Sequence, residues 1–318
     1  MNILAPVNSL IAAEKMISAG AKEIYLGVDD CVFDTYSFTG RGKVSNCGSK
    51  VVLEFDALGE LVAYAHENNV RVNFIANTPY MHNGQLENTS LENAYLNYVE
   101  NGLRVGIDSV VIGDIGLLYR VSKQNYNVEL HASVYLKTLN SYQLLLLSKL
   151  GVTRVCLSYH VVLDEIESLV QQNIMDVEVV GYLGCSFFNG ACGFLHELGE
   201  GRYDGFDPGV ACKNVYEITG GLCNRRVKFD VERGCAICSL GNLNKIGVKA
   251  LKIVGRDRGC DQTEQIVRLY AMMLKAHEDG TYSDKLRDEV LPLWWKRVWC
   301  SGRRCKYLNT EMSKYVIG

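Results

Sequence analysis

One pattern of polar and apolar positions recurs four times along the chain. A helix-like stretch ends at a glycine, about three mixed residues follow, and a short aliphatic run comes next, in residues 20–27, 106–113, 151–158 and 247–255. Glycine suits the left-handed position that ends a helix, and an unbroken aliphatic run suits a strand buried on both faces. Each copy therefore predicts a helix that leads directly into a strand of a parallel sheet.

The segments between these copies continue the alternation. Strands are predicted at 3–5, 72–75, 128–131 and 177–180, and apolar side chains at helical spacing predict helices around 58–65, 91–98, 144–147 and 166–170. Asn140 or Ser141 can cap the third of these helices. About eight strand–helix units across residues 1–278 favour a (β/α)8-type, TIM-like barrel. The alternative is an open doubly wound sheet, but no Gly-x-Gly-x-x-Gly follows the first strand to indicate its dinucleotide-binding version.

Two regions depart from this alternation. Residues 181–240 show no clear strand–helix unit and are predicted to form a cysteine-rich insertion before the last strand. Residues 279–318 are predicted to form a helical extension packed on the barrel. This extension places Trp294, Trp295 and Trp299 among basic residues, a combination typical of a helix packed by its tryptophans or of a surface that binds RNA or a peptide.

Composition and charge indicate where the protein works and which partners it can bind. The formal net charge of −3 gives no overall field that favours nucleic acid or a membrane. The chain opens without a basic and apolar leader, and its apolar runs are too short to cross a bilayer, so we expect a cytoplasmic protein without a membrane partner. The cytoplasm keeps thiols reduced, so the 12 cysteines indicate metal binding rather than disulfides.

Half of the cysteines lie in the insertion. They are Cys185, Cys192, Cys212, Cys223, Cys235 and Cys238. Four thiolates can hold a [4Fe–4S] cluster or a zinc ion. Six residues separate the first pair and only Cys235 and Cys238 have the close spacing of a zinc knuckle, so the pattern favours the cluster and leaves zinc as the alternative. Inert burial is a third interpretation, and it fits Cys156, which lies inside a predicted strand.

The residues around the first pair resemble a known family. The segment Val180-Gly-Tyr-Leu-Gly-Cys185-Ser-Phe-Phe-Asn-Gly-Ala-Cys192 resembles the signature of the peptidase U32 family. Further matches are Leu4-Ala-Pro-Val, Glu23-Ile-Tyr-Leu-Gly27, His131-Ala-Ser133, Arg233-Gly-Cys235 and Leu251-Lys-Ile-Val-Gly-Arg256. The resemblance extends from residue 3 to about residue 275.

The resemblance implies a chemistry as well as a fold. Characterised branches of the family are iron–sulfur proteins of ubiquinone biosynthesis and of RNA hydroxylation that work without molecular oxygen, and other members are described as collagenase-like peptidases. By resemblance, Cys185, Cys192, Cys212 and Cys235 take the positions of the cluster ligands, with Cys223 and Cys238 as alternates. The implied function is an oxygen-independent hydroxylase-type enzyme acting on RNA, an aromatic small molecule or a peptide. The alternatives are a collagenase-like peptidase and a non-catalytic electron-transfer or scaffold subunit, and a second U32-type subunit or a homodimer is an expected partner.

The chain departs from the family pattern at two places. Val254 stands where many relatives have Glu, and Val134-Tyr135 replace the usual Thr-Gln after His131-Ala-Ser133. Both positions lie near the C-terminal ends of predicted strands, where barrels keep their active sites. These differences predict a substrate or chemistry that differs from the better-known branches.

The same strand ends supply the candidate catalytic residues. His131 is proposed as a general acid or base, Arg256 as the residue that recognises an anion, and Asp114 as a further catalytic candidate. His131 and Arg256 also have structural interpretations, as a hydrogen-bonded histidine and as a surface ion pair. The sequence contains neither His-Glu-x-x-His nor Gly-x-Ser-x-Gly, which weakens the peptidase alternative. Other polar candidates at these ends are Asp29, Asp30, Asn77, Ser133 and His160.

Overall fold

The computed structural model describes residues 1–28, 54–77, 89–183, 215–218, 225–228, 234–254, 259–301 and 304–307. Within these residues eight parallel strands close into a barrel in the order β1-β10-β7-β6-β5-β4-β3-β2. The strands are β1 (Asn2–Pro6), β2 (Glu23–Leu26), β3 (Arg71–Ile75), β4 (Ser109–Ile112), β5 (Glu129–Ala132), β6 (Val152–Cys156), β7 (Asp176–Tyr182) and β10 (Ala250–Ile253). The predicted (β/α)8-type barrel is confirmed, and the open sheet is excluded.

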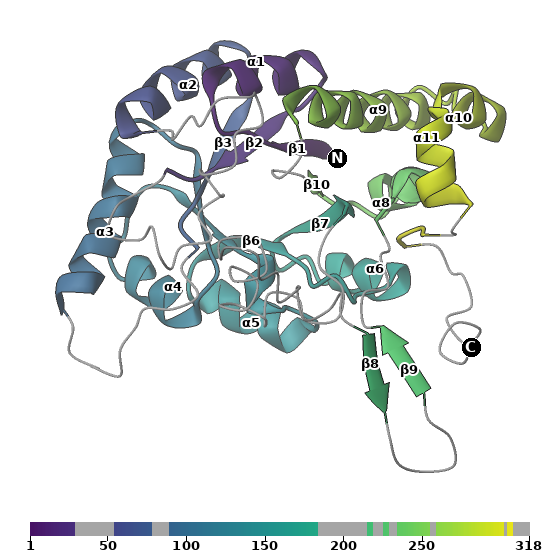
Figure 1. Cartoon of the computed structure of the whole chain (residues 1–318). Coiled ribbons are helices and arrows are strands. Elements are labelled where there is room, and N and C mark those ends of the chain that lie inside the picture. Colours follow the sequence, from purple (N-terminus) through teal and green to yellow (C-terminus); the bar gives the residue numbers. More distant parts are fainter. Residues whose placement is uncertain are drawn as a thin grey trace.

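Helices surround the closed sheet (Figure 1). They are α1 (Leu10–Ser18), α2 (Phe55–Glu67), α3 (Thr89–Arg104), α4 (Ile115–Ser122), α5 (Ser141–Lys149), α6 (Leu163–Gln171), α8 (Leu240–Lys245) and α9 (Cys260–Glu278). Asn140 caps α5 by accepting a hydrogen bond from the backbone of Gln143, as predicted. Among the residues described, no helix is long and apolar enough to span a membrane.

The recurrent glycines end helices as the sequence predicted. Gly20, Gly106, Gly151 and Gly247 all have a positive φ, between 78° and 106°, which is the left-handed region that side chains with a Cβ avoid. Gly20 is also crowded, because a Cβ there would lie 2.8 Å from the Cβ of Ala271 on α9. The pattern therefore sets the end of each helix, and at Gly20 it also allows the close approach of α9.

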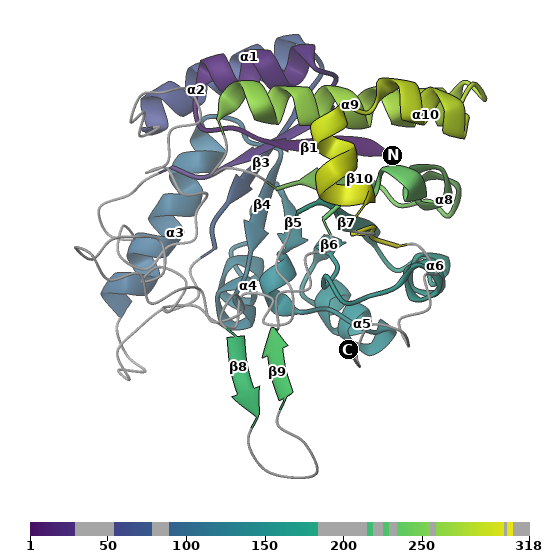
Figure 2. The ribbon, with the colours of Figure 1, turned by 45° about the vertical axis from the view of Figure 1, so that its right-hand side comes forward.

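The insertion between β7 and β10 contains one feature that sequence reasoning missed. β8 (Val215–Ile218) and β9 (Arg225–Lys228) form an antiparallel pair that projects from the barrel (Figures 1 and 2). The chain returns to the barrel at Cys235, passes through a 3-10 turn, η3 (Ile237–Ser239), and enters α8. The insertion thus contains regular structure, but as a strand pair rather than a strand–helix unit.

The C-terminal extension comprises α10 (Asp284–Val290), α11 (Leu293–Trp295) and a π-helical turn, η4 (Lys296–Cys300). The Trp295 ring is fully buried and stacks 5.3 Å from Tyr182 of β7, while Tyr270 of α9 meets it edge-on at 6.1 Å. Trp299 is 3% exposed and also contacts Tyr182. Two of the three tryptophans therefore anchor the extension to the outside of the barrel.

Apolar side chains form two kinds of core. The main core lies between the strands and the surrounding helices. A small second cluster, Leu4, Tyr25, Ile75 and Val111, comes from four adjacent strands and fills part of the barrel lumen. Since side chains alternate across a strand, residues two positions from these members also face the lumen. That rule places an unusual number of polar groups inside the barrel.

Candidate functional site

The deep part of the lumen holds a connected set of buried polar side chains, which we call the lumen network: Glu23, Asn73, Ser109 and Arg154. Each is at most 2% exposed. Arg154 Nη1 donates to Glu23 Oε2 at 2.5 Å, Asn73 Nδ2 donates to the same oxygen at 3.1 Å, and Ser109 Oγ donates to Asn73 Oδ1 at 2.7 Å. Asn2 Nδ2 satisfies the other carboxylate oxygen at 2.8 Å. These contacts tie five strands, β1, β2, β3, β4 and β6, together through side chains.

The electrostatics of the lumen network favour the charged forms of Glu23 and Arg154. Burial alone raises the pKa of Glu23, but the hydrogen bond and charge of Arg154, with help from Asn2 and Asn73, outweigh it and hold that pKa below its ordinary value. The same pairing raises the pKa of Arg154 against the opposing effect of burial. A buried carboxylate that accepts hydrogen bonds from three side chains is a structural unit, because its acceptor capacity is used by the protein itself.

A second ion pair lies beside the lumen network. Lys252 Nζ is 3.5 Å from Glu178 Oε1 and 4.3 Å from the centre of the Tyr25 ring. Both charged side chains are almost buried, with 11% and 6% exposure. Lys252 and Glu178 lie on the adjacent strands β10 and β7, so this pair joins the strands that flank the insertion.

The mouth of the lumen, at the C-terminal ends of the strands, is arranged differently. Asn77 follows β3 and donates through Nδ2 to Ser133 Oγ, 3.1 Å away beyond the end of β5. Gly113, after β4, makes room for this contact, because a Cβ there would lie 2.7 Å from Asn77 Oδ1 and 3.1 Å from the Tyr135 ring. Asn77 is 5% exposed, yet in the described part of the chain its Oδ1 has no hydrogen-bond partner.

His131 lies one step deeper on β5 and is 2% exposed. Its Nε2 is 3.1 Å from Glu129 Oε2, and within the described residues its Nδ1 has no hydrogen-bond partner. Burial lowers the pKa of His131. This effect outweighs that of the hydrogen bond to Glu129, which raises the pKa, and the charge of Arg154 reinforces it. A neutral ring that donates from Nε2 to Glu129 presents Nδ1 to the lumen as an acceptor.

The two departures from the family pattern meet at this mouth. Val134, Cys156 and Val180 form one apolar cluster, and Tyr135, Tyr159 and Val254 pack against it. Val134 and Tyr135 are far from Val254 in the sequence, but their side chains belong to the same cluster. One side of the mouth is therefore apolar.

The exit of β7 brings the insertion to this mouth. Tyr182 and Cys235 form an antiparallel bridge, the Leu183 amide donates to the Gly234 carbonyl at 2.9 Å, and Leu183 adopts a left-handed φ of 53°. The end of β7 and Cys235 are therefore neighbours in the fold.

Cys235 is the one primary cluster candidate within the described residues, because Cys185, Cys192, Cys212 and the alternate Cys223 lie outside them. It is 4% exposed, and burial raises the pKa of its thiol to about 12, opposed by the Ile237 amide and the Trp295 indole. A thiol in such surroundings becomes a thiolate when a metal binds it. In the described part of the chain, no three His, Cys, Asp or Glu side chains already form a metal site.

The C-terminal extension adds cysteines that the spacing did not connect to Cys235. Cys305 pairs with Cys235 in a parallel backbone bridge. Cys300 is exposed as a residue, but its thiol is partly covered. This partial burial, and secondarily the nearby Cys238, raises the pKa of the thiol. Cys238 Sγ lies 3.8 Å from Arg287 Nη1. No local sequence signal could have placed these thiols together, because the extension packs on the barrel through its tryptophans.

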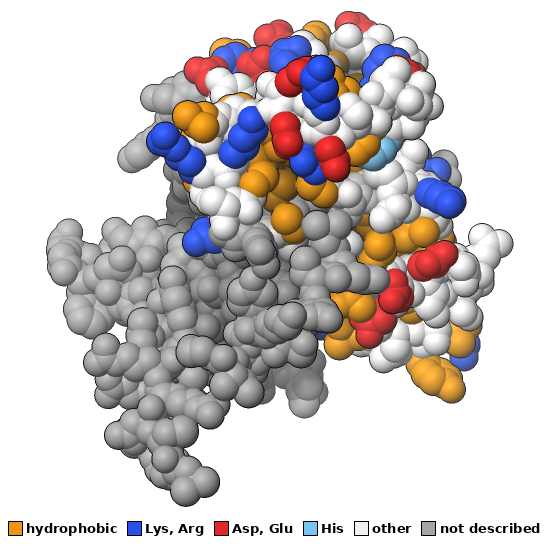
Figure 3. All heavy atoms as spheres, turned by 90° about the vertical axis from the view of Figure 1, so that its right-hand side faces the viewer, with side chains coloured by type: hydrophobic (Ala, Val, Ile, Leu, Met, Phe, Trp, Pro, Cys, Tyr) orange, Lys and Arg blue, Asp and Glu red, His pale blue; other side chains and the backbone are white. Residues whose placement is uncertain are grey.

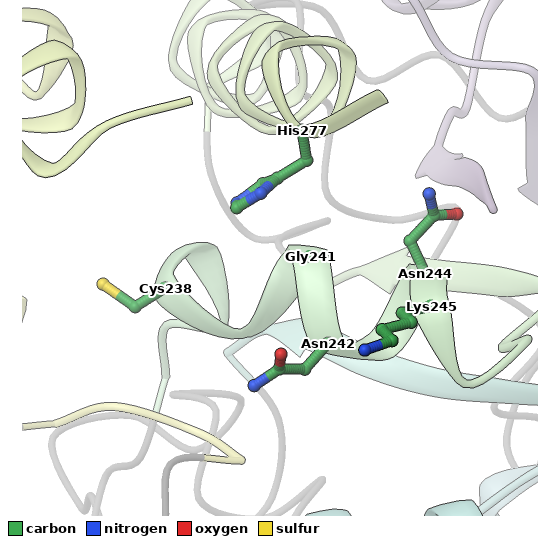
Figure 4. A pocket seen from close by; sticks show the side chains of 6 residues that line it. All are labelled: Cys238, Gly241, Asn242, Asn244, Lys245 and His277. Carbon is green, nitrogen blue, oxygen red and sulfur yellow. The ribbon is translucent and has the colours of Figure 1, made fainter. Parts of the chain in front are cut away.

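A cavity of about 400 Å³ lies outside the barrel, between α8 and the end of α9, lined by Cys238, Gly241, Asn242, Asn244, Lys245 and His277 (Figure 4). A Cβ at Gly241 would lie 2.6 Å from the His277 ring, so the glycine allows the two helices to approach. His277 in turn stacks on Tyr282. The close packing indicates a structural joint between α8 and α9.

The face over α9 and α10 carries mixed charge (Figure 3). Lys275, Lys285 and Arg287 each form an ion pair with an acidic residue one helical turn away. Such paired surface charges contribute little and create no field of one sign. The described part of this face therefore gives no basic footprint for nucleic acid.

The remaining predicted residues are divided between the mouth and its rim. Asp114 caps α4 by accepting from the Leu117 amide at 2.8 Å. His160 is exposed beyond β6, with Nδ1 3.2 Å from Ser158 Oγ. The structure thus brings His131, Asn77 and Ser133 together. Arg256, Asp29 and Asp30 lie outside the described residues.

Comparison with known proteins gives a consistent family. The sequence profile of Peptidase family U32 matches residues 8–299. An uncharacterized protease of Methanocaldococcus jannaschii is 24% identical over 90% of this chain and 68% of its own length. The 23S rRNA 5-hydroxycytidine synthase of Escherichia coli is 25% identical over 87% of this chain and 39% of its own length. The tRNA hydroxylation protein P of Haemophilus influenzae is 30% identical over 66% of this chain and 58% of its own length.

Among solved structures, a U32 peptidase is 11% identical, with a TM-score of 0.49 over 80% of this chain and 93% of that one. The chain spans about two fifths and three fifths of the lengths of the two RNA-modifying relatives. The match of the family profile extends over nearly the whole barrel and into the C-terminal extension. The chain therefore belongs to peptidase family U32.

Proposed function

We propose that this protein is an oxygen-independent hydroxylase-type enzyme that modifies RNA and holds a [4Fe–4S] cluster on Cys185, Cys192, Cys212 and Cys235. Two relatives named for RNA hydroxylation match 87% and 66% of the chain, which supports RNA as the substrate. The observation that carries the proposal is the bridge between Tyr182 and Cys235, because it puts one candidate thiol beside the segment that leads to Cys185.

The location of the Cys235 backbone relative to the barrel supports a reaction at the mouth. The Cys235 carbonyl accepts from the Lys306 amide, and Lys306 Nζ donates to the carbonyl of Val180, which belongs to the apolar cluster at the mouth. When bound, such a cluster would supply electron transfer or a site on iron for substrate. The chain itself would bind the substrate, exclude water through Val134, Tyr135 and Val254, and offer acceptors at His131 Nδ1 and Asn77 Oδ1.

Metal analysis of protein purified without oxygen tests the cluster. We expect a brown protein with about four iron and four sulfide per chain, and loss of both in Cys185→Ala and Cys235→Ala. Cys260→Ala is the matched control, because Cys260 is a buried cysteine at the start of α9 and not one of the candidate ligands. A colourless wild type that carries stoichiometric zinc would overturn the cluster and support the zinc alternative.

The substrate requires a separate test. Nucleoside mass spectrometry is performed on RNA from host cells that lack their own hydroxylation enzymes and express either wild type or Cys185→Ala. We expect a hydroxylated nucleoside with wild type alone. If wild type with its full content of iron and sulfide leaves the RNA unchanged, RNA is not the substrate.

A peptidase is the second candidate, favoured by the relative described as a protease and by one contact. Ser158 Oγ lies 3.2 Å from His160 Nδ1 at the C-terminal end of β6, within the reach of a nucleophile and a base. Casein or gelatin hydrolysis that is lost in Ser158→Ala and kept in Ser148→Ala would support this function. Ser148 is a suitable control because its hydroxyl only caps a carbonyl on the exposed side of α5.

A further inference from the structure

The outside of the barrel is apolar on one side. Seven of the eleven exposed large apolar side chains among the described residues lie on or directly before three consecutive helices, α4, α5 and α6. We call these seven the outer patch: Ile115, Tyr119, Leu139, Tyr142, Leu145, Leu146 and Val162. Figures 1 and 2 both show the three helices next to one another.

Helix α5 carries the centre of the outer patch. Leu144 and Leu147 are buried against the barrel, while Tyr142, Leu145 and Leu146 are 82%, 45% and 52% exposed. Residues three and four positions apart lie on the same side of a helix, so the three exposed side chains form one outward face. A helix that is apolar on both sides is normally covered on both sides. Helix α5 therefore has the composition of a buried helix, although one of its faces is exposed.

The outer patch is large enough for an interface between proteins. At these exposed fractions its side chains present on the order of 500 Å² of apolar surface, which is as much as the largest patch of a typical monomer. A standard interface covers about 800 Å² of each partner, a little over half of it apolar. The outer patch thus supplies the apolar share of one partner's surface.

Charged side chains of opposite sign flank the outer patch at its two ends. Helices α4, α5 and α6 run in the same direction, because each follows a strand of a parallel sheet. Lys123 and Lys149 stand at the C-terminal ends of α4 and α5, and Asp164 and Glu165 stand in the first turn of α6. All four are exposed, and none forms an ion pair within the described residues. At the mouth the two acids outnumber Lys137, the exposed lysine before α5.

We propose that the outer patch is the contact surface of a homodimer, in which a second copy of this chain packs α5 against α5 about a two-fold axis. The flanking charges select this occupant. An axis perpendicular to α5 makes the two helices antiparallel, so the Lys149 end of each copy meets the Asp164 end of the other. Parallel packing would oppose like charges.

The antiparallel arrangement directs the two mouths to opposite ends of the dimer, because the N-terminal ends of α5 and α6 lie on the mouth side of the barrel. Each copy then keeps its own candidate site. The inference goes beyond the proposed function and does not depend on the cluster or on RNA. Its failure would leave the proposed function intact.

Sedimentation velocity over a range of protein concentrations tests the homodimer. We expect wild type to have twice the mass of the chain, and Tyr142→Glu/Leu145→Glu to associate at least tenfold more weakly, because two charges would enter the contact. Ile11→Glu is the matched control, because Ile11 is 57% exposed on α1, outside the outer patch, and this variant should dimerise like wild type. Unchanged dimerisation in the double variant would overturn the proposal.

Exchange of the flanking charges tests the antiparallel packing. Lys149→Glu and Asp164→Lys each place like charges in contact and should weaken association at low salt. The double variant with both changes restores opposite charges and should associate more tightly than either single variant. Glu165 is left unchanged, because its carboxylate accepts from the Val162 amide at the start of α6. A double variant that associates no better than the weaker single variant would overturn the two-fold contact.

The contact can be observed in wild type even if a variant does not fold. In an equal mixture of ¹⁴N-labelled and ¹⁵N-labelled wild type, a carbodiimide should join Lys149 to Asp164 or Glu165 in peptides of mixed label. A dimer in which only other lysines are joined to acids between copies would refute the proposed packing.

A monomeric wild type would overturn the homodimer, and the stability of Leu145→Glu would then identify the other occupant. A large loss in the free energy of unfolding would mean that the chain covers the outer patch itself. A neutral substitution would leave the outer patch to a different protein.

Discussion

The lumen network and the mouth lie in one barrel, yet they treat buried polar groups in opposite ways. In the lumen network the Glu23 carboxylate receives hydrogen bonds from Arg154, Asn73 and Asn2, and only Arg154 Nε among its described polar atoms lacks a partner. At the mouth, Asn77 Oδ1 and His131 Nδ1 are equally buried and have no partner among the described residues. The difference teaches that the deep network serves folding, while the mouth is incomplete among the residues that the structure describes.

Removal of the buried carboxylate should give the largest effect. Glu23→Ala leaves the Arg154 guanidinium buried without its partner, so we expect a loss of about 3–5 kcal/mol in the free energy of unfolding, measured by urea denaturation. The double variant Glu23→Leu/Arg154→Met removes both charges and should recover most of that loss. A single variant as stable as wild type would mean that the network contributes nothing to folding.

The second largest effect is expected from crowding at the mouth of the barrel. Gly113→Ala places a Cβ 2.7 Å from Asn77 Oδ1, so either Asn77 or the Tyr135 ring must move, at a cost of about 1–3 kcal/mol. RNA modification should fall with it. Gly59→Ala is the control, because its Cβ would meet Val105 at an ordinary 3.6 Å inside α2, and the change should be neutral or slightly stabilising.

A matched pair of substitutions sharpens the comparison directly. Asn73→Leu breaks bonds to Glu23 and Ser109 and should cost about 1–3 kcal/mol. Asn77→Leu removes a side chain with an unsatisfied oxygen and should change stability by about 1 kcal/mol or less, while it abolishes modification. Equal losses of stability in both variants would show that the two regions do not differ in kind.

How much of the fold and of the site was predictable depends on how far apart in the sequence the interacting residues are. The glycines at 20, 106, 151 and 247 act through local backbone conformation, so the sequence revealed the alternation and hence the barrel. Asn77 and His131 were predictable as mouth residues because they follow or end strands. The role of Glu23 was not, because its partner Arg154 is 131 residues away and the pair forms only when the sheet closes.

The contribution of the C-terminal extension was hidden for a similar reason. Lys306 stands in a basic stretch that is typical of a solvated or nucleic-acid-binding surface, yet it enters the barrel because residues 304–306 pair with residues 234–235. The strand pair β8 and β9 was missed because its residues, such as those of Arg225–Lys228, lack an apolar alternation against a core. Long-range pairing decides the case of Lys306, whereas β8 and β9 pair locally without an apolar pattern that would report it.

The smallest predicted effect concerns pH and His131. Burial lowers the pKa of this ring in the folded chain below its ordinary value of 6.5. As the pH falls below about 6.5, the unfolded chain takes up a proton that the folded chain refuses, so stability should decrease with a slope of at most about 1.4 kcal/mol per pH unit. Denaturation midpoints at pH 5.0–7.5 should show this slope in wild type and a shallower one in His131→Gln.

The pKa of Glu129 is lowered to about 2, first by its hydrogen bond to His131, so the contribution of Glu129 to stability is lost only at more acidic pH and does not confuse the test. A slope in His131→Gln equal to that of wild type would mean that the ring is protonated as easily in the folded chain as in water, and the acceptor assigned to Nδ1 would then be a donor.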